Sequence, residues 1–130
     1  MGPFAGKRFL GALHSAAMKL NHLNLTVTDA LETQKFLEKY FGLKSMVKGS
    51  PKMAFVSDDN GMVISMFKGT DVKYPESFHI GFIQESPERV DEINRRLKDD
   101  GFDVPPPSKQ HGSWTFYFLA PGGFTIEVLC

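Results

Sequence analysis

The sequence of 130 residues has a single cysteine, Cys130, at its last position. It therefore has no cysteine pair for an internal disulfide or a cysteine-based zinc site, and we expect a reducing, cytoplasmic setting. The 15 basic and 15 acidic residues cancel, so the concentrated basic surface that binds nucleic acid is not expected. No apolar run approaches the roughly 20 residues of a membrane-spanning helix. These absences favour a globular cytoplasmic protein that binds neither nucleic acid nor membrane.

The length and composition fit one globular domain of about 100–150 residues. Hydrophobic residues make up 42% of the chain and charged residues 23%, as in average folded proteins. Twelve phenylalanines and six methionines are many for this length, and they suit a core or an apolar pocket. Residues 1–17 contain no acidic residue and no clear strand or helix pattern. We interpret them as an N-terminal arm or a vector remnant, and residues 18–130 as the domain.

The first half of this domain has the pattern of a strand, a helix and three more strands. Residues 20–28 alternate between apolar and polar types, which predicts a strand. Asp29 is placed to cap a helix, with Glu32 three residues later, and Gly42 is placed to end that helix in a left-handed conformation. Three apolar segments separated by turn-forming sequences then predict strands around 44–47, 52–57 and 62–67.

The same order of elements is predicted a second time. Residues 78–84 alternate as a strand, and Ser86 followed by proline marks the start of a helix. Glu92 and Arg96 have the spacing of an i,i+4 ion pair in this helix, which we expect to end at Gly101. Strands are then predicted near 102–104, 114–119 and 124–129, with Pro-Gly-Gly as the last turn.

The chain is therefore interpreted as a duplicated βαβββ unit, with modules of about residues 19–68 and 77–129. His22 lies in the first strand of one module and His79 in the first strand of the other. Aligning the last strands makes Ser65 the equivalent of Glu127. A repeat of this period is a specific structural signal. It predicts an α+β fold in which paired βαβββ modules form a curved mixed sheet around a metal or ligand cleft.

Strand alternation predicts that His22, His79 and Glu127 point to the side of the sheet that lacks the helix. Each of them taken singly is more often a core or surface residue. Their coincidence at equivalent places of a duplicated unit favours a joint role. Two imidazoles and one carboxylate are the protein ligands of many Fe(II), Mn(II), Zn(II) and Ni(II) sites with open positions, so a metal site is the preferred interpretation.

Four short motifs occur around these residues: Asn21-His22-Leu23, Tyr40-Phe41-Gly42-Leu43, Phe78-His79-Ile80 and the segment from Tyr117 to Glu127. Together they resemble the vicinal oxygen chelate superfamily, which includes glyoxalase I, bleomycin-resistance proteins and extradiol dioxygenases. The resemblance implies a divalent ion (Mn, Fe, Zn or Ni) held by His22, His79 and Glu127. It also implies a homodimer in which His22 comes from one subunit and His79 with Glu127 from the other.

The fourth equivalent position separates members of this superfamily. Glyoxalase I typically has a glutamate where this chain has Ser65. Fosfomycin-resistance thiol transferases have a similar triad and share the segment 115–119, but they have a threonine at the place of Asn24 and an arginine-bearing tail beyond the place of Cys130. Extradiol dioxygenases share the triad and are usually longer. The resemblance therefore implies a lyase, a dioxygenase or a thiol transferase in which the metal acts as a Lewis acid on an oxygen of a small-molecule substrate.

Further residues are candidates for catalysis or for the substrate pocket. Tyr117 either donates a hydrogen bond to substrate or to a ligand, or fills the core. His111 is a candidate acid or base, or a solvated loop histidine. The candidates for the pocket are Asn24, Ser65, Phe67, Trp114 and Thr115. Ser65 either bonds a metal-bound water or simply fills the place of a lost ligand.

Two other functions are open to such a fold. A binding protein would sequester a hydrophobic or aromatic compound without turnover, with Val63, Phe67 and Ile83 facing the cavity. A scaffold with a vestigial cleft is disfavoured by the intact triad. A metal requirement for binding or turnover separates the enzyme from the binding protein.

Overall fold

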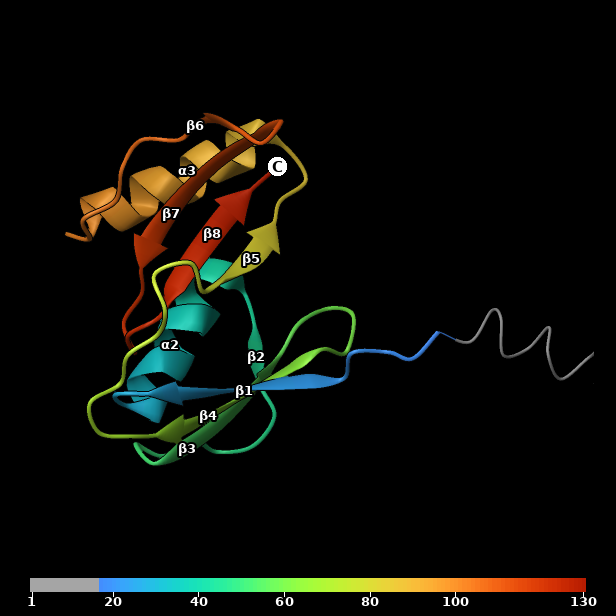
Figure 1. The fold of residues 1–130 in the computed structure, drawn as a ribbon, viewed down its shortest axis with the longest axis vertical. Coiled ribbons are helices and arrows are strands. Elements are labelled where there is room, and N and C mark those ends of the chain that lie inside the picture. The colour runs from blue at the N-terminus through green and yellow to red at the C-terminus, as the bar shows by residue number, and fades with distance from the viewer. Residues whose placement is uncertain (1–16) are drawn as a thin grey trace, which may run out of the picture.

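The computed structural model describes residues 17–130, so the expected N-terminal arm lies almost wholly outside the described residues. These residues form two modules with the same order of elements (Figure 1). The first module consists of β1 (His22–Val27), α2 (Ala30–Phe41), β2 (Lys44–Ser45), β3 (Met53–Ser57) and β4 (Val63–Lys68). The second consists of β5 (His79–Ile83), α3 (Pro87–Asp99), β6 (Ser108–Gln110), β7 (Ser113–Leu119) and β8 (Thr125–Leu129). The predicted α+β fold of paired βαβββ modules is confirmed.

Each module has a separate four-stranded sheet, with strand orders β1-β4-β3-β2 and β5-β8-β7-β6. The first and last strands of each module pair in parallel, and the other pairs are antiparallel. Asn24 lies opposite Ser65, and Gly81 lies opposite Glu127. Asn24 and Gly81 each lie two residues after the histidine of their strand. The registers therefore confirm that Ser65 and Glu127 occupy equivalent positions.

The helices begin and end where the capping residues predict. The Asp29 side chain accepts a hydrogen bond from the Glu32 amide, and Ser86 caps α3 in the same way with a proline at the start of the helix. Gly42 ends α2 at φ 68°, a left-handed conformation that costs glycine little. Helix α3 ends at Asp99 with Asp100 as its cap, and Gly101 follows at φ 93°.

The prediction of a strand near 102–104 is wrong, because β6 forms later, at Ser108–Gln110. The Phe102 ring instead packs edge-on against Phe36 and Tyr40, with centroids 5.4 and 5.7 Å away. The three prolines at 105–107 then lack the N–H groups that a strand ladder needs. Pairing with β7 therefore begins only after them.

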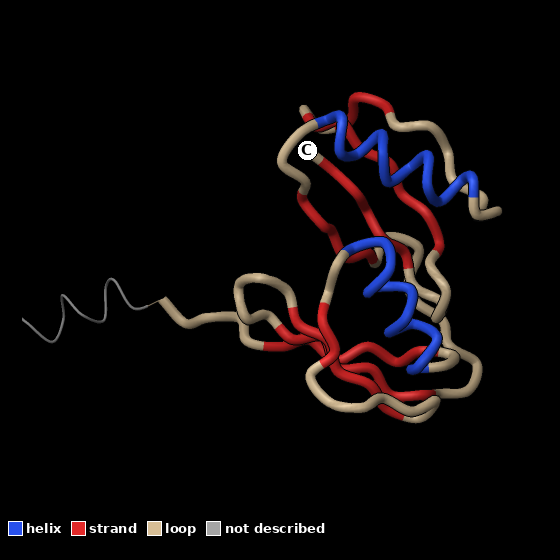
Figure 2. Tube along the Cα trace, turned by 180° about the vertical axis from the view of Figure 1, so that it is seen from behind, coloured by secondary structure: helices blue, strands red, loops and turns tan. Residues whose placement is uncertain are grey.

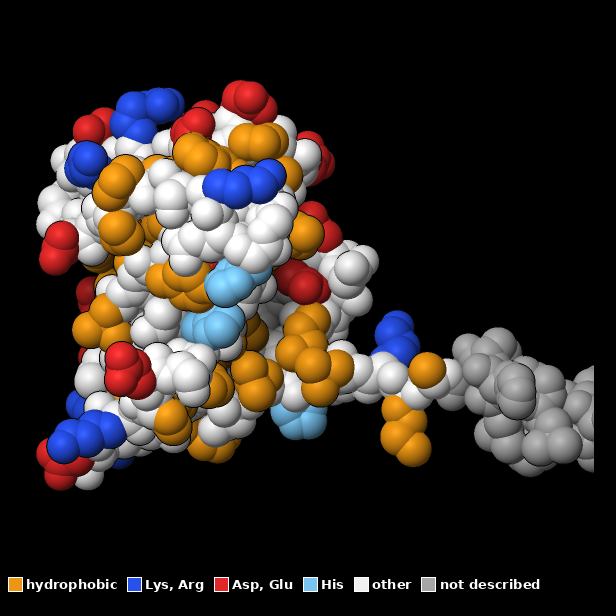
Figure 3. Space-filling view, turned by 45° about the horizontal axis from the view of Figure 1, so that its top comes forward, with side chains coloured by type: hydrophobic (Ala, Val, Ile, Leu, Met, Phe, Trp, Pro, Cys, Tyr) orange, Lys and Arg blue, Asp and Glu red, His pale blue; other side chains and the backbone are white. Residues whose placement is uncertain are grey.

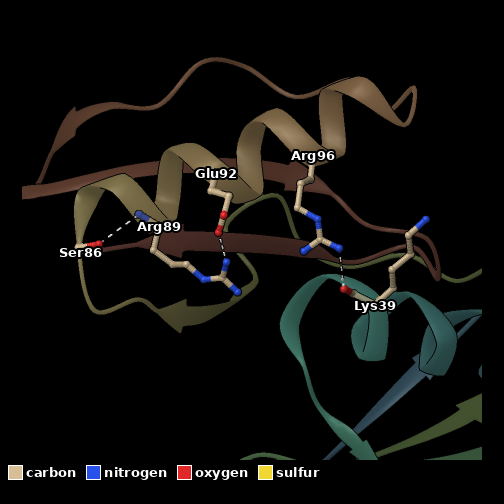
Figure 4. Close-up of polar contacts among 5 residues, drawn as sticks. All are labelled: Lys39, Ser86, Arg89, Glu92 and Arg96. Carbon is tan, nitrogen blue, oxygen red and sulfur yellow. Dashed lines mark hydrogen bonds and ion pairs between the residues drawn. The ribbon is translucent and has the colours of Figure 1, made fainter.

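The ion pair expected between Glu92 and Arg96 is also wrong. Glu92 pairs with Arg89, which is one helical turn earlier (Figure 4). Arg96 instead donates a hydrogen bond to the backbone oxygen of Lys39 at 3.1 Å, so it connects α3 with the last turn of α2 (Figure 4). Tertiary contact between the modules has replaced a local helix pair.

One helix covers one face of each sheet, and we call the opposite face the helix-free face (Figures 1 and 2). The strand residues that face the helices are mostly buried and form one core with α2 and α3. Where the modules meet, the Tyr40 hydroxyl donates to an Asp100 carboxylate oxygen at 2.5 Å, and the Thr28 amide donates to the Gly122 oxygen. No helix within residues 17–130 has the length and apolar character needed to cross a membrane.

Strands β1 and β5 each lie at an edge of their sheet. Odd-numbered positions of β1 bond to β4, as the bonds at Asn21 and Val27 show, so the backbone groups of the even-numbered positions face outward. One outward position is already satisfied, since the Tyr74 hydroxyl accepts from the Thr26 amide at 2.8 Å and donates to the Thr26 oxygen at 2.7 Å. Within residues 17–130, no backbone hydrogen bond joins the outward groups nearer the start of β1.

Candidate metal centre and the cavity beside His22

His79 and Glu127 come together on the helix-free face of the second module. Glu127 lies on β8 opposite Gly81, and Gly81 is two residues after His79 on β5. The histidine and the carboxylate approach each other beside this glycine, with Nε2 of His79 3.4 Å from Oε1 of Glu127. Glu127 is only 8% exposed, whereas the imidazole is open to solvent. The pair is therefore accessible to solvent from the side of the imidazole.

Neighbouring groups fix which atoms of this pair are free to bind a ligand. Nδ1 of His79 lies 3.0 Å from the backbone oxygen of Ser77. A carbonyl can only accept, so Nδ1 carries the proton, and in the neutral imidazole Nε2 then offers its lone pair. The hydroxyl of Thr115, which is fully buried, donates to Oε2 of Glu127 at 2.8 Å. The two atoms left to bind a metal or another ligand, Nε2 of His79 and Oε1 of Glu127, face each other.

The chemistry and the spacing of these two atoms fit a divalent transition metal. Imidazole nitrogen and carboxylate oxygen bind such ions at about 2.0–2.2 Å, so two ligands of one ion lie about 3.0–3.4 Å apart. The observed 3.4 Å falls at the end of this range. Hydrogen bonds from the far side of each ligand, as Ser77 and Thr115 provide here, are typical of metal sites.

Tyr117 lies beside this pair. It is directly opposite Glu127 in the β7–β8 register, and its ring meets the His79 ring edge-on with centroids 5.2 Å apart. Burial, and next the neighbouring Glu127 carboxylate, raise the pKa of the Tyr117 hydroxyl above its usual value of 10.0. The hydroxyl is therefore protonated at neutral pH and able to donate a hydrogen bond.

His22 lies on the helix-free face of the first module, beside a cavity of about 420 Å³. Its Nδ1 is 3.1 Å from the side-chain oxygen of Asn21, which again leaves Nε2 free. Ser65 takes the position that corresponds to Glu127, and its hydroxyl donates to Oδ1 of Asn24 at 2.7 Å. The cavity is lined by Asn21, His22, Asn24, Phe55, Val63, Ser65 and Phe67. Three of the predicted pocket residues, Asn24, Ser65 and Phe67, are thus brought together next to His22.

The three predicted metal ligands do not meet within one chain. Among residues 17–130, no group of three His, Cys, Asp or Glu side chains is arranged to hold an ion. In Figure 3, two patches of histidine side chain lie next to each other on the surface and a third lies apart. His79 and Glu127 form one part of the predicted triad, and His22 belongs to a different sheet.

Other predicted site residues lie elsewhere. Trp114 was expected at the rim of the pocket, but β7 begins at Ser113, so alternation turns Trp114 to the helix-covered face, where its Nε1 donates to Asp91 of α3 at 2.7 Å. His111 lies in the turn between β6 and β7 at φ 53°, and its role as an acid or base stays a prediction. Ile83 lines a second cavity of about 620 Å³ between the modules, not the cavity beside His22.

Three contributors were missed from the sequence, and one of them is Asn21, which lines the cavity and contacts Nδ1 of His22. Phe55 lines the cavity, and its place on the helix-free face follows from alternation within β3. The backbone oxygen of Ser77, which sets the His79 tautomer, left no signal in residue type because any residue supplies a carbonyl.

Comparison with known proteins agrees with this fold. Residues 19–128 match the family model of the Glyoxalase/Bleomycin resistance protein/Dioxygenase superfamily, and the chain belongs to this superfamily. A structure described as that of a possible glyoxalase from Bacillus cereus is 53% identical, covers 88% of this chain and 100% of that one, and superimposes with a TM-score of 0.82.

Two more distant relatives have described activities. The fosfomycin resistance protein FosX of Listeria monocytogenes is 25% identical, with 87% of this chain and 93% of that one covered and a TM-score of 0.73. A "Probable trivalent organoarsenical cleaving enzyme" of Bacillus subtilis (strain 168) is 28% identical over 85 residues, which are 65% of this chain. The match spans only 58% of that curated relative.

Proposed function

We propose that this protein is a divalent-metal-dependent enzyme of the vicinal oxygen chelate type that acts on a small molecule. The observation that carries the proposal is the His79–Glu127 pair, whose free Nε2 and Oε1 atoms lie 3.4 Å apart and are held from behind by Ser77 and Thr115. A bound divalent ion would supply Lewis acidity toward a substrate oxygen, as expected of a lyase, dioxygenase or thiol transferase.

We further propose that the third ligand, His22, comes from a second copy of the chain. In one copy His22 lies on a different sheet from His79 and Glu127, and no three such groups within residues 17–130 are arranged around an ion. Two free sheet edges, β1 and β5, carry the two histidines. An unpaired edge strand offers its backbone N–H and C=O groups to another chain, which supports a homodimer that joins these edges.

Each of these residues would then have a distinct role. His79, Glu127 and the partner's His22 would hold the ion and leave positions open for substrate. Tyr117 is protonated at neutral pH and would donate a hydrogen bond to a substrate oxygen beside His79. Thr115 would keep the Glu127 carboxylate in its orientation.

Metal titration tests the proposal. Protein purified without chelator, then titrated with Mn(II), Fe(II), Zn(II) and Ni(II), is expected to bind about one ion per chain. His79→Ala and Glu127→Gln should abolish binding, and His111→Ala serves as the matched control that retains it. Failure of the wild type to bind any of these ions would refute the enzyme proposal and favour sequestration of an apolar compound.

Mixed dimers test the exchange between subunits. His22→Ala and His79→Ala chains are each expected to bind no metal as homodimers. A heterodimer of the two has one site with both changes and one intact site, so it should recover about one ion per dimer. If each chain built its own site, the mixture would recover none.

A further inference from the structure

The cavity beside His22 has an aromatic wall and a polar floor. The Phe55 and Phe67 rings meet edge-on with centroids 6.4 Å apart, and Val63 lies on the strand between β1 and β3. Phe67 is 43% exposed although it is large and apolar. An exposed aromatic wall in a concave site is suited to a planar apolar group.

The strands within residues 17–130 place almost no positive charge on the helix-free faces. Alternation and register put a basic side chain on these faces at only one strand position within residues 17–130, Lys44, and this position lies on β2, the strand farthest from β1. The basic residues Lys68 and Lys109 fall on the opposite alternation, in register with the helix-facing side. Phosphonates and carboxylates are recognised by arginine or lysine donors, and the cavity lining has neither.

Asn24 supplies a hydrogen-bond donor to the cavity. Ser65 is 7% exposed, and its hydroxyl donates to Oδ1 of Asn24 at 2.7 Å. This bond occupies the oxygen end of the amide and turns the NH₂ end, with two donors, away from Ser65. No acceptor in residues 17–130 bonds this NH₂ group, and the Asn24 side chain is exposed on the cavity.

We propose that the cavity binds an uncharged aromatic compound that carries a carbonyl or hydroxyl oxygen. The ring packs against Phe55 and Phe67, and Asn24 Nδ2 donates a hydrogen bond to the oxygen. Ser65 acts as a positioning residue that holds the amide in the donating orientation. The inference rests on the proposed function, which makes the neighbouring His22 a metal ligand. It narrows the substrate of that metal site to uncharged compounds.

Calorimetric titration with matched probes tests this specificity. Acetophenone and catechol are the neutral probes, and benzoate and phenylphosphonate are the anionic ones. Each is titrated into chelator-treated protein and into protein reloaded with metal. The neutral probes are expected to bind at least about tenfold more tightly than the anions to the metal-free protein, because no cation compensates the desolvation of the anion.

Variants separate the donor from mere packing. Asn24→Asp keeps the shape but removes the donor, and it should weaken the neutral probes about tenfold. Ser65→Ala should weaken them several-fold, Ser65→Thr should restore binding, and Lys44→Ala is the matched control without effect. Equal or tighter binding of the anions, unchanged binding by Asn24→Asp, or no neutral probe bound at ~10 mM would overturn the inference.

The two proposals fail separately. Normal metal uptake without a preference for neutral probes would refute the inference and leave the metal enzyme intact. Neutral probes that bind through Asn24 in a protein that takes up no metal would support the inference and refute the enzyme.

Discussion

The hydrogen bond between Thr115 and Glu127 gives the sharpest energetic prediction. Thr115 is fully buried, Glu127 is 8% exposed, and the hydroxyl is 2.8 Å from Oε2. A hydrogen bond to a charged group contributes about 1.5–3 kcal/mol, and an unpaired buried acceptor costs a similar amount. Thr115→Val removes the hydroxyl and keeps the shape, so the free energy of unfolding at pH 7 should fall by about 1.5–3 kcal/mol.

Urea unfolding followed by the fluorescence of Trp114, the single tryptophan, measures this loss. Chelator and one fixed protein concentration keep metal binding and association constant. Thr115→Ser is the matched control, because it keeps the hydroxyl and loses only a methyl group worth about 0.8 kcal/mol. In a Glu127→Gln background, the effect of Thr115→Val should shrink, since the acceptor is no longer charged.

Metal affinity gives a second measurement of the same contact. Thr115→Val should weaken metal binding by about 10–100-fold, as expected for the loss of a group that orients a ligand, and Thr115→Ser should not. A loss of stability below about 0.5 kcal/mol, or an equal loss in the Glu127→Gln background, would refute the reasoning that Thr115 acts through this carboxylate.

Three further predictions concern backbone freedom and pH. Gly122→Ala should lower the free energy of unfolding by about 1–3 kcal/mol, because φ is 106° and the added Cβ would lie 2.7 Å from Oγ1 of Thr33; urea unfolding at wild-type midpoint would contradict this. Gly81→Ala should leave the free energy of unfolding unchanged or raise it by up to about 1 kcal/mol, since its Cβ would meet nothing closer than 3.5 Å. A large loss of stability in the same assay would show that the methyl group is not accommodated. The hydrogen bond from Tyr40 holds the pKa of Asp100 below its usual 3.8, so the stability that Asp100 adds is present above that value and is lost as pH falls below it. The stability difference between wild type and Asp100→Asn should therefore be largest near neutral pH and shrink as the pH falls below 3.8, and a difference independent of pH would argue against this role.

Much of the architecture follows from the sequence alone, because local patterns specify it. Asp29, Gly42 and Ser86 mark helix ends through hydrogen bonds to residues a few positions away, which a short stretch of sequence contains in full. Strand alternation likewise places His22 and Glu127 on the helix-free face. The duplication in the sequence predicts that Ser65 and Glu127 are equivalent, and the strand registers confirm it.

Only the tertiary structure decided which groups meet. The expected Glu92–Arg96 ion pair does not form, because Arg96 donates a hydrogen bond to the backbone oxygen of Lys39 on the other module and Glu92 pairs with Arg89. The prolines after Phe102 displaced a strand. Such outcomes depend on contacts between residues far apart in the chain, whose geometry no local pattern encodes.

The same division holds at the site. The sequence by itself supplied the types of the candidate ligands and the faces they occupy, since the faces depend on periodicity. Tertiary packing decided that His79 and Glu127 approach to 3.4 Å beside Gly81 and that Thr115 binds the carboxylate. It also decided that His22 lies on the other sheet, because each four-stranded sheet is complete in itself and leaves its histidine-bearing strand at a free edge.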